Sequence, residues 1–113
     1  MAIKRAAVIG GGSFGTVIAN ILADNGVEIL QWMRNESIAD SINQEHVNPD
    51  YLPDTKLNPA LRATTDLKEA VEGVDVIFVS VPSKFVRQVV GSFASDLKPE
   101  QALVSTTKGI EPD

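Results

Sequence analysis

Apolar runs and amphipathic stretches alternate along the first third of this chain. Aliphatic runs at 6–9 and 27–32 are typical of parallel strands covered on both faces. The segment between them has apolar residues at helical spacing, namely Phe14, Val17, Ile18, Ile21 and Leu22. Gly26 follows where a left-handed C-cap ends a helix. This pattern predicts strand, helix and strand in about thirty residues, the length of one βαβ unit with a right-handed crossover.

The rest of the chain continues the alternation. The pattern predicts a short helix over 36–44, a loop over 45–60, a short strand over 61–64, a helical turn from Asp66 to Gly73, and strands over 74–81 and 102–106. Between the last two strands, Ser83 is expected to cap a helix that carries Phe85, Val86, Val89, Val90 and Phe93. This order predicts an α/β fold of the Rossmann type. We expect a doubly wound parallel sheet of about five strands with flanking helices, in one domain over 1–113.

A glycine-rich turn joins the first expected strand to the first expected helix. In the run from Gly10 to Gly15, Gly10 would allow the tight turn, Gly12 would admit a cofactor pyrophosphate, and Gly15 would allow close contact between helix and strand. Such a motif alone is weak evidence, because glycine clusters also occur in flexible loops. Its position after a strand and before an amphipathic helix favours dinucleotide binding.

The start of that helix supplies the expected phosphate donors. The N–H groups of Ser13 and Phe14 should face the phosphates, and the Ser13 hydroxyl is a further donor. Two structural alternatives stay open at this point. Ser13 is also a common type of N-cap residue, and Phe14 is also a common type of core residue.

The end of the second expected strand bears on the choice of cofactor. NAD enzymes usually place an acidic residue about twenty residues beyond the glycines, where it holds the ribose 2′-hydroxyl. This chain has Arg34 there, whose guanidinium suits a 2′-phosphate, so the sequence favours NADP. Glu36 keeps NAD possible, and a solvated surface charge is the alternative for Arg34.

Composition excludes several other classes of partner and site. The net charge is −5 and the ten basic residues are scattered, which argues against a nucleic-acid partner. We find no apolar stretch of membrane-spanning length and no export signal, so we expect no membrane partner and a cytoplasmic location. There is no cysteine, and we predict no metal site. The lone His46 is expected to be an exposed loop residue.

Five motifs carry a family resemblance: Ile9-Gly10-Gly11-Gly12-Ser13-Phe14-Gly15-Thr16, Trp32-Met33-Arg34, Tyr51-Leu52-Pro53, Val81-Pro82-Ser83 and Thr106-Thr107-Lys108-Gly109-Ile110-Glu111. Together they resemble bacterial NAD(P)-dependent glycerol-3-phosphate dehydrogenase, and the last motif is the most specific. The resemblance implies hydride transfer between NAD(P)H and the dihydroxyacetone phosphate/glycerol 3-phosphate pair, for phospholipid synthesis. It also implies cofactor contacts from Ser13, Phe14, Arg34, Tyr51 and Pro82, and a Lys108 close to both nicotinamide and substrate. The alternative for Tyr51 is a loop residue that covers the core, and the alternative for Lys108 is a solvated lysine at a strand end.

The resemblance has departures and leaves alternatives. Gly11 stands where the family often has alanine, and Phe14 where it often has tryptophan. In that family a helical second domain carries the general acid/base lysine, so we expect no catalytic residue in this chain, cofactor binding without turnover, and a homo-oligomeric parent enzyme. The other hypotheses are a stand-alone nucleotide-sensing module, and a reductase of another small phosphorylated or hydroxy acid substrate.

Overall fold

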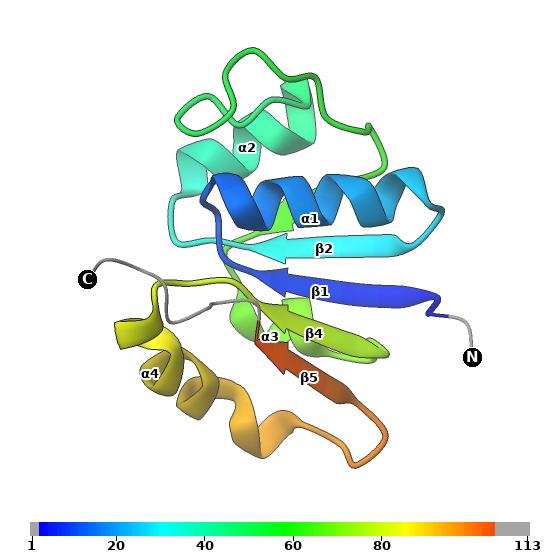
Figure 1. Cartoon of the computed structure of the whole chain (residues 1–113), viewed down its shortest axis with the longest axis vertical. Helices are drawn as coiled ribbons and strands as arrows, with labels where there is room; N and C mark the ends of the chain where they lie inside the picture. The colour runs from blue at the N-terminus through cyan, green and yellow to red at the C-terminus, as the bar shows by residue number, and fades with distance from the viewer. Residues whose placement is uncertain (1–2, 106–113) are drawn as a thin grey trace.

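The computed structural model describes residues 3–105 and contains one parallel sheet (Figure 1). Its order is β3-β2-β1-β4-β5, with β1 at the centre. The strands are β1 (Arg5–Ile9), β2 (Glu28–Trp32), β3 (Arg62–Thr64), β4 (Val76–Val79) and β5 (Ala102–Ser105). Each lies within a predicted apolar run or one residue beyond it. The predicted doubly wound α/β fold of about five strands is therefore confirmed.

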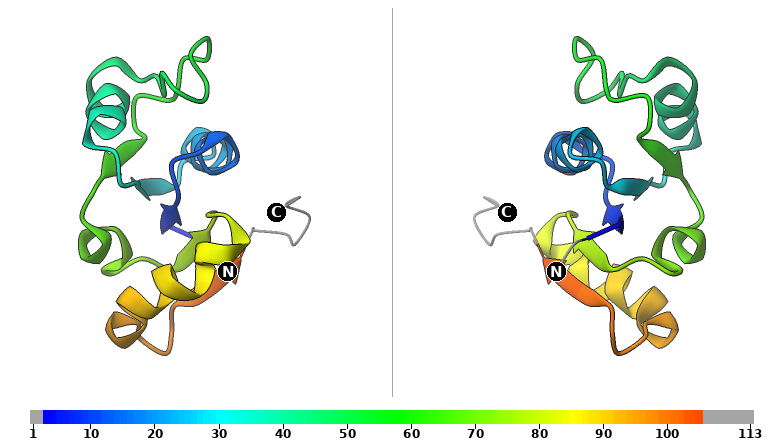
Figure 2. Two further views of the ribbon diagram at one scale, coloured as in Figure 1. Left: turned by 90° about the vertical axis from the view of Figure 1, so that its left-hand side faces the viewer. Right: turned by 90° about the vertical axis from the view of Figure 1, so that its right-hand side faces the viewer.

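Helices cover both faces of this sheet (Figure 2). They are α1 (Ser13–Asp24), α2 (Glu36–Glu45), α3 (Leu67–Val71) and α4 (Ser83–Phe93), followed by the short 3₁₀ helix η1 (Ala94–Asp96). One buried cluster joins α1 and α2 to the sheet, and a second cluster joins α3 and α4 to the opposite face. Since β1 and β4 contribute residues to both clusters, these strands are buried on both faces, as their apolar runs predict.

Helix α1 buries only part of the face that its apolar spacing predicts, since Ile18 and Leu22 pack against the core and are partly buried. Phe14, Val17 and Ile21 are 56%, 40% and 53% exposed. The residues buried against the sheet are small ones, namely Gly15, Thr16, Ala19 and Ala23. A close helix–strand approach explains this choice, because a Cβ at Gly15 would lie only 2.8 Å from the carbonyl oxygen of Gly10. Small residues let the helix backbone reach the sheet, and Phe14, Val17 and Ile21 are left exposed.

Of the two predicted helix caps, Asp66 is confirmed and Ser83 is not, while Asn35 is a cap that was not predicted. Asn35 accepts a hydrogen bond from the Ile38 N–H at the start of α2, and Asp66 accepts from the second and third amides of α3, as predicted. Ser83 is instead the first residue of α4, whose N-cap is Pro82, so the prediction of a Ser83 cap is wrong.

His46 also differs from its prediction. It is the C-cap of α2 in the left-handed conformation, with φ of 62°. The side chain is partly buried, and its Nδ1 atom has no hydrogen-bond partner within residues 3–105. The expectation of an exposed loop histidine is therefore wrong on exposure, because the residue is the C-cap of α2 and its side chain is partly buried.

The described part of the chain contains neither a membrane-spanning helix nor a cluster of metal-binding side chains. No helix within residues 3–105 is long and apolar enough to cross a membrane. The same residues contain no cluster of three or more His, Cys, Asp or Glu side chains with the spacing of a metal site.

Candidate functional site

A cleft of about 820 Å³ opens at the carboxyl ends of the strands. The chain leaves β1 toward β2 on one side, while β4 pairs with β1 on the other side, so the strand order reverses at this place. Open parallel sheets bind ligands at such a switch point. The residues that line the cleft are Gly10, Gly11, Gly12, Ser13, Phe14, Gly15, Trp32, Met33, Arg34, Asn35, Ile38, Asp50, Tyr51, Ser80, Val81, Pro82, Phe85 and Val89.

The cleft brings together the site residues that the sequence singles out between positions 3 and 105. These are Gly10, Gly12, Ser13, Phe14, Gly15, Arg34, Tyr51 and Pro82. The predicted strand-end residues Thr106 and Thr107, and the predicted substrate residue Lys108, lie outside the described residues. The shared cleft shows that the first group is positioned to act together, and its assignment to a cofactor stays a prediction.

Each end of the glycine turn, residues 10–15, meets a distinct steric demand. Gly10 has φ of +139°, and a Cβ there would collide with the backbone carbonyl oxygen of Ser80. Gly15 lies against the Gly10 carbonyl, as described above. A Cβ on Gly12, in contrast, would meet no atom within 4 Å among the described residues. The space above Gly12 is therefore open to the cleft, as the approach of a ligand phosphate requires.

The backbone donors of this turn have no protein partner. Within residues 3–105, no hydrogen bond engages the N–H groups of Gly11, Gly12, Ser13 or Phe14, and the first internal bond of α1 is from the Thr16 amide to the Gly12 carbonyl. The N-cap of α1 is Gly12, so the alternative of a Ser13 cap is wrong. Phe14 is mostly exposed, so the alternative of a core Phe14 is wrong too.

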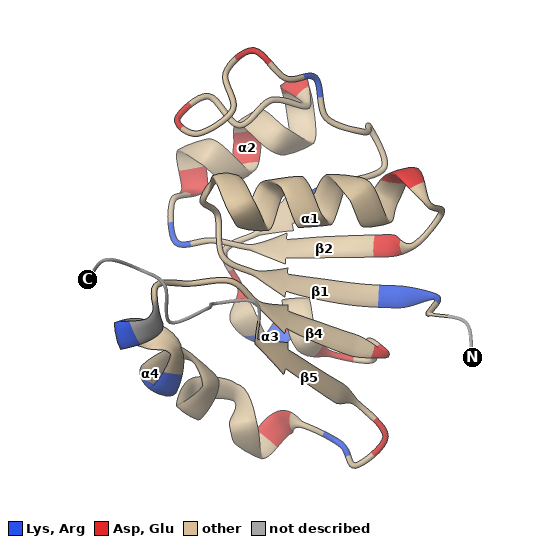
Figure 3. Cartoon of the chain, viewed as in Figure 1, with Lys and Arg blue, Asp and Glu red and all other residues tan. Residues whose placement is uncertain are grey.

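Charge and capping distinguish the start of α1 from two other helices of the fold. Helices α2 and α3 each have a side-chain cap and an acidic residue in the first turn, whereas α1 has neither. A carboxylate there would repel a ligand anion and occupy the free amides. Figure 3 shows the absence of acidic residues along α1 before its last residue. The turn therefore presents a partial positive charge to the cleft.

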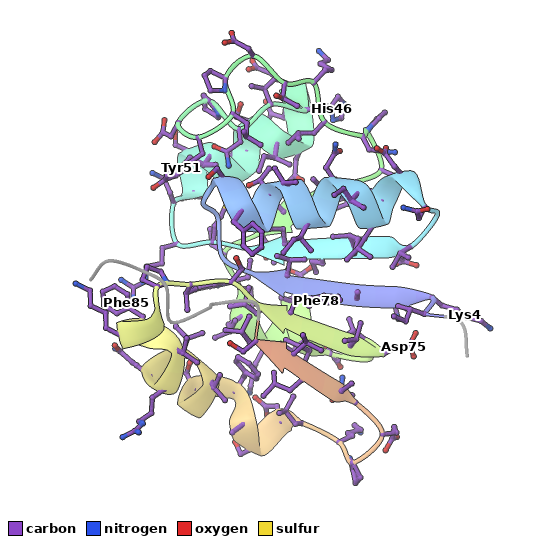
Figure 4. The ribbon with its side chains drawn as sticks, viewed as in Figure 1. Lys4, His46, Tyr51, Asp75, Phe78 and Phe85 are labelled. Atoms are coloured by element: carbon purple, nitrogen blue, oxygen red, sulfur yellow. The ribbon has the colours of Figure 1, made fainter. Side chains whose placement is uncertain are left out.

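Basic and aromatic side chains form the flanks of the cleft. Arg34 follows β2 and is exposed, and no ion pair engages it within residues 3–105. Glu36 is not among the described residues that line the cleft. It lies in the first turn of α2, where its negative charge interacts favourably with the dipole of that helix. Tyr51, which is 52% exposed, and Phe85 lie on opposite sides of the strand ends (Figure 4).

Sequence reasoning missed part of this site. Met33, Ser80 and Phe85 line the cleft, although no role there was predicted for them. Three buried polar side chains, Thr16, Gln31 and Asn48, lie behind the glycine turn. Gln31 carried a usable signal, since a glutamine within an apolar strand run needs a buried partner. Asn48 carried none, because asparagine is ordinary in a turn-rich loop.

At the opposite end of the sheet, a carboxylate accepts hydrogen bonds from two backbone amides. Asp75 accepts hydrogen bonds from the backbone N–H groups of Lys4, at 2.9 Å, and Arg5, at 3.1 Å. These two bonds, with smaller contributions from the charges of both residues, lower the pKa of the Asp75 carboxyl from its ordinary value. This carboxylate joins the start of β1 to the segment before β4 and lies away from the cleft.

Comparison with known proteins gives a consistent result. The sequence profile of the NAD-dependent glycerol-3-phosphate dehydrogenase N-terminus matches residues 5–113. Glycerol-3-phosphate dehydrogenase [NAD(P)+] of Limosilactobacillus fermentum is 46% identical over 112 residues, covering 96% of this chain and 33% of the relative. The enzyme of that name from Teredinibacter turnerae is 52% identical over 108 residues, covering 95% and 32%.

A solved structure agrees with these relatives. The crystal structure of glycerol-3-phosphate dehydrogenase from Coxiella burnetii superposes with a TM-score of 0.85 at 31% identity, covering 93% of this chain and 32% of that one. The chain thus spans about a third of the length of the proteins it matches. From the profile, the identities and the shared fold, this chain belongs to the family of the NAD-dependent glycerol-3-phosphate dehydrogenase N-terminus.

Proposed function

We propose that this chain binds an NAD(P) dinucleotide, with the pyrophosphate at the glycine turn. The observation that carries the proposal is the set of unpartnered N–H groups from Gly11 to Phe14, next to the open space above Gly12. Such amides at a helix start bind phosphate oxygens, and the absence of an acidic first turn in α1 suits a dianionic ligand. The residues present therefore fit the cofactor that the family name implies.

We further propose that Arg34 pairs with the 2′-phosphate of NADPH, which makes NADP the preferred cofactor. Arg34 lines the cleft beside the N-terminus of α2 and has no competing carboxylate partner within the described residues. Its guanidinium presents paired donors that match a phosphate, whereas a ribose hydroxyl would be better served by an acidic residue. Tyr51 and Phe85 supply apolar surface for the flat parts of the cofactor.

The parent enzyme is proposed to reduce dihydroxyacetone phosphate to glycerol 3-phosphate, and to run the reverse reaction. This proposal rests on family membership and on the shared names of the relatives. The nicotinamide of the bound cofactor supplies or accepts the hydride, and the described residues of this chain hold and orient that cofactor. A protein that contains this chain should oxidise NADPH only when dihydroxyacetone phosphate is added. Oxidation with another small phosphorylated or hydroxy acid substrate instead would contradict this assignment.

The cofactor proposal is tested by titrating the chain with NADPH and with NADH while following cofactor fluorescence. The Arg34→Ala variant should bind NADPH about tenfold more weakly, because an exposed charge pair with phosphate is lost, and should bind NADH as before. Arg62→Ala is the matched control, since Arg62 is exposed at the amino end of the sheet, away from the cleft. Equal affinity of the wild-type chain for both cofactors would remove the role of Arg34.

A further inference from the structure

Three polar side chains are buried together behind the glycine turn. Gln31 from β2, Thr16 from α1 and Asn48 from the loop after α2 are each 0% exposed. Within residues 3–105, these three are the buried residues with polar side chains. We call these residues the polar triad. Burying polar groups is costly unless they find partners, so their hydrogen bonds indicate what they do.

The polar triad binds two carbonyl groups of the glycine turn. Gln31 Nε2 donates to the Gly10 carbonyl oxygen at 2.7 Å and to Thr16 Oγ1 at 3.0 Å. Asn48 Nδ2 donates to the Gly11 carbonyl oxygen at 3.0 Å and also to Thr16 Oγ1 at 3.0 Å. Each amide therefore holds one carbonyl of the turn, and the Thr16 hydroxyl connects the two amides.

The planarity of the peptide bond converts these contacts into an orientation of the N–H groups. The described residues contain no cis peptide bond, and in a trans peptide the C=O and the following N–H point in opposite directions. With the Gly10 and Gly11 carbonyls drawn toward the buried triad, the N–H groups of Gly11 and Gly12 point away from it. These are two of the amides that have no protein partner.

Asn48 extends the same network to the loop on the other side of the cleft. Its Oδ1 atom accepts the Tyr51 N–H at 3.2 Å, and its backbone carbonyl accepts the Leu52 N–H at 2.9 Å. The turn that presents Tyr51 is thus fixed by the side chain that also holds Gly11. The glycine turn and the Tyr51 loop are joined through one buried asparagine.

Stability alone does not account for this arrangement. Gln31 Oε1 is buried and has no partner within residues 3–105. An unsatisfied buried acceptor is destabilising, and an apolar side chain of similar shape would avoid that cost. The glutamine therefore has a use beyond packing, and its Nε2 donor to the Gly10 carbonyl supplies one.

We propose that Gln31, Thr16 and Asn48 are positioning residues that aim the phosphate-binding amides of the glycine turn into the cleft and align the Tyr51 loop with them. This inference rests on the proposed dinucleotide function and deepens it. Because the triad acts on the backbone at the pyrophosphate position, it serves NADH and NADPH equally. That equality separates its effect from the effect of Arg34, which is specific to the 2′-phosphate.

The first test compares two glutamines that each hold two acceptors through Nε2. Gln101 Nε2 donates to the carbonyls of Val71 and Val74, both at 2.9 Å, near the amino ends of the strands. We expect Gln31→Met to weaken the binding of NADH and of NADPH by the same factor, about tenfold, measured by fluorescence titration of the chain. Gln101→Met should keep the wild-type affinity for both, although it loses three hydrogen bonds, one more than Gln31→Met, because Gln101 Oε1 also accepts the Lys98 N–H.

The second test uses Thr16 and keeps the inference falsifiable if Gln31→Met fails to fold. Thr16→Val removes the shared hydroxyl at nearly constant shape and should weaken both cofactors by several-fold. Thr16→Ser retains the hydroxyl and should restore affinity to within about twofold of the wild type. Thermal unfolding without ligand, recorded for every variant, separates a loss of fold from a loss of positioning.

The outcomes distinguish this inference from the proposed function. A wild-type chain that binds neither cofactor overturns both. A wild-type chain that binds, with folded Gln31→Met and Thr16→Val variants of unchanged affinity, overturns the triad alone. Equal weakening by Gln101→Met would also overturn it, because the loss would then reflect general stability. A loss restricted to NADPH would place the triad's effect at the 2′-phosphate and contradict the inference.

Discussion

Polar side chains bind the backbone at both ends of the sheet, but they accept hydrogen bonds at one end and donate them at the other. At the amino end, the Asp75 carboxylate accepts the N–H groups of Lys4 and Arg5, so backbone donors are consumed there. At the carboxyl end, Gln31 and Asn48 donate to carbonyls of the glycine turn, so backbone acceptors are consumed and the donors stay free. One end closes its hydrogen bonds within the protein, and the other end leaves N–H groups for a ligand.

This difference shows that the side-chain chemistry behind a turn matters as much as the turn itself. A glycine turn backed by a carboxylate would lose its amides to the protein. Backed by amide donors, it keeps them available and directed outward. Gln101 and Gln31 differ in the same way. Gln101 joins the segment before β5 to the end of α3 and to the segment between α3 and β4, whereas Gln31 holds the Gly10 carbonyl at the cleft.

The largest effect is expected when the open space at the carboxyl end is filled. Gly12 has φ of −77° and ψ of −173°, which any residue can adopt, and its Cβ direction is free of described atoms. Gly12→Val should therefore fold normally and lower the affinity for NADH and NADPH by about a hundredfold, because the valine occupies the phosphate position. The measurement is a fluorescence titration with a parallel unfolding curve.

The control for that variant is Gly91→Val, because Gly91 lies in α4 and a Cβ there also meets nothing within 4 Å among described residues. It should leave cofactor affinity unchanged. If Gly12→Val bound cofactor as tightly as the wild type, the pyrophosphate would have to lie elsewhere.

Much of this comparison follows from the sequence, and part of it does not. The apolar runs predicted the five strands, and the reason, burial on both faces, holds for β1 and β4. The edge strand β5 is exposed along its length. The residue spacing also placed Arg34 at the end of β2. The buried face of α1 was predicted only in part, because periodicity ranks residues by hydrophobicity and gives no weight to the close approach that selects Gly15 and Ala19.

The polar triad could not be predicted for a related reason. Its members come from a strand, a helix and a loop, and the hydrogen bonds that the two side-chain amides donate span 15 to 37 positions along the chain. No local pattern records such distant pairs, so the unusual glutamine in β2 gives no indication of its partners. The left-handed conformation of His46 was not predicted either, since its position as the C-cap of α2 depends on where that helix ends.

A smaller effect is expected at Gly10, where the change acts on the fold. Gly10→Ala would force a Cβ against the Ser80 carbonyl and keep an alanine at positive φ. The free energy of unfolding should fall by about 2 kcal/mol, as expected for backbone strain with overpacking. Urea denaturation measures this loss. A stability equal to that of the wild type would show that β1 and β4 can separate here at no cost.

The smallest effect is expected at the amino end and concerns pH. The Asp75 pKa is lower in the folded chain than its ordinary value of 3.8, so its stabilising contribution is present above that value and is lost as the pH falls below it, through the lowered native pKa. Asp75→Asn should thus reduce the urea midpoint near neutral pH, and the gap to wild type should shrink as the pH drops below 3.8.

Cofactor affinity should not change in Asp75→Asn, since the carboxyl lies away from the cleft. Asp54→Asn serves as the control, because Asp54 is an exposed residue of the loop after α2. A gap between Asp75→Asn and wild type that stayed constant down to strongly acidic pH would show that the two backbone hydrogen bonds do not depend on the ionised carboxylate.

The most direct measurement is an amide NMR titration of the ¹⁵N-labelled chain with NADPH. The N–H signals of Gly11, Gly12, Ser13 and Phe14 should shift most, because new hydrogen bonds form at groups that have no partner within the described protein. The amides of Lys4 and Arg5, already bound to Asp75, should shift least. Largest shifts at the amino end, or none in the glycine turn, would contradict this account of the site.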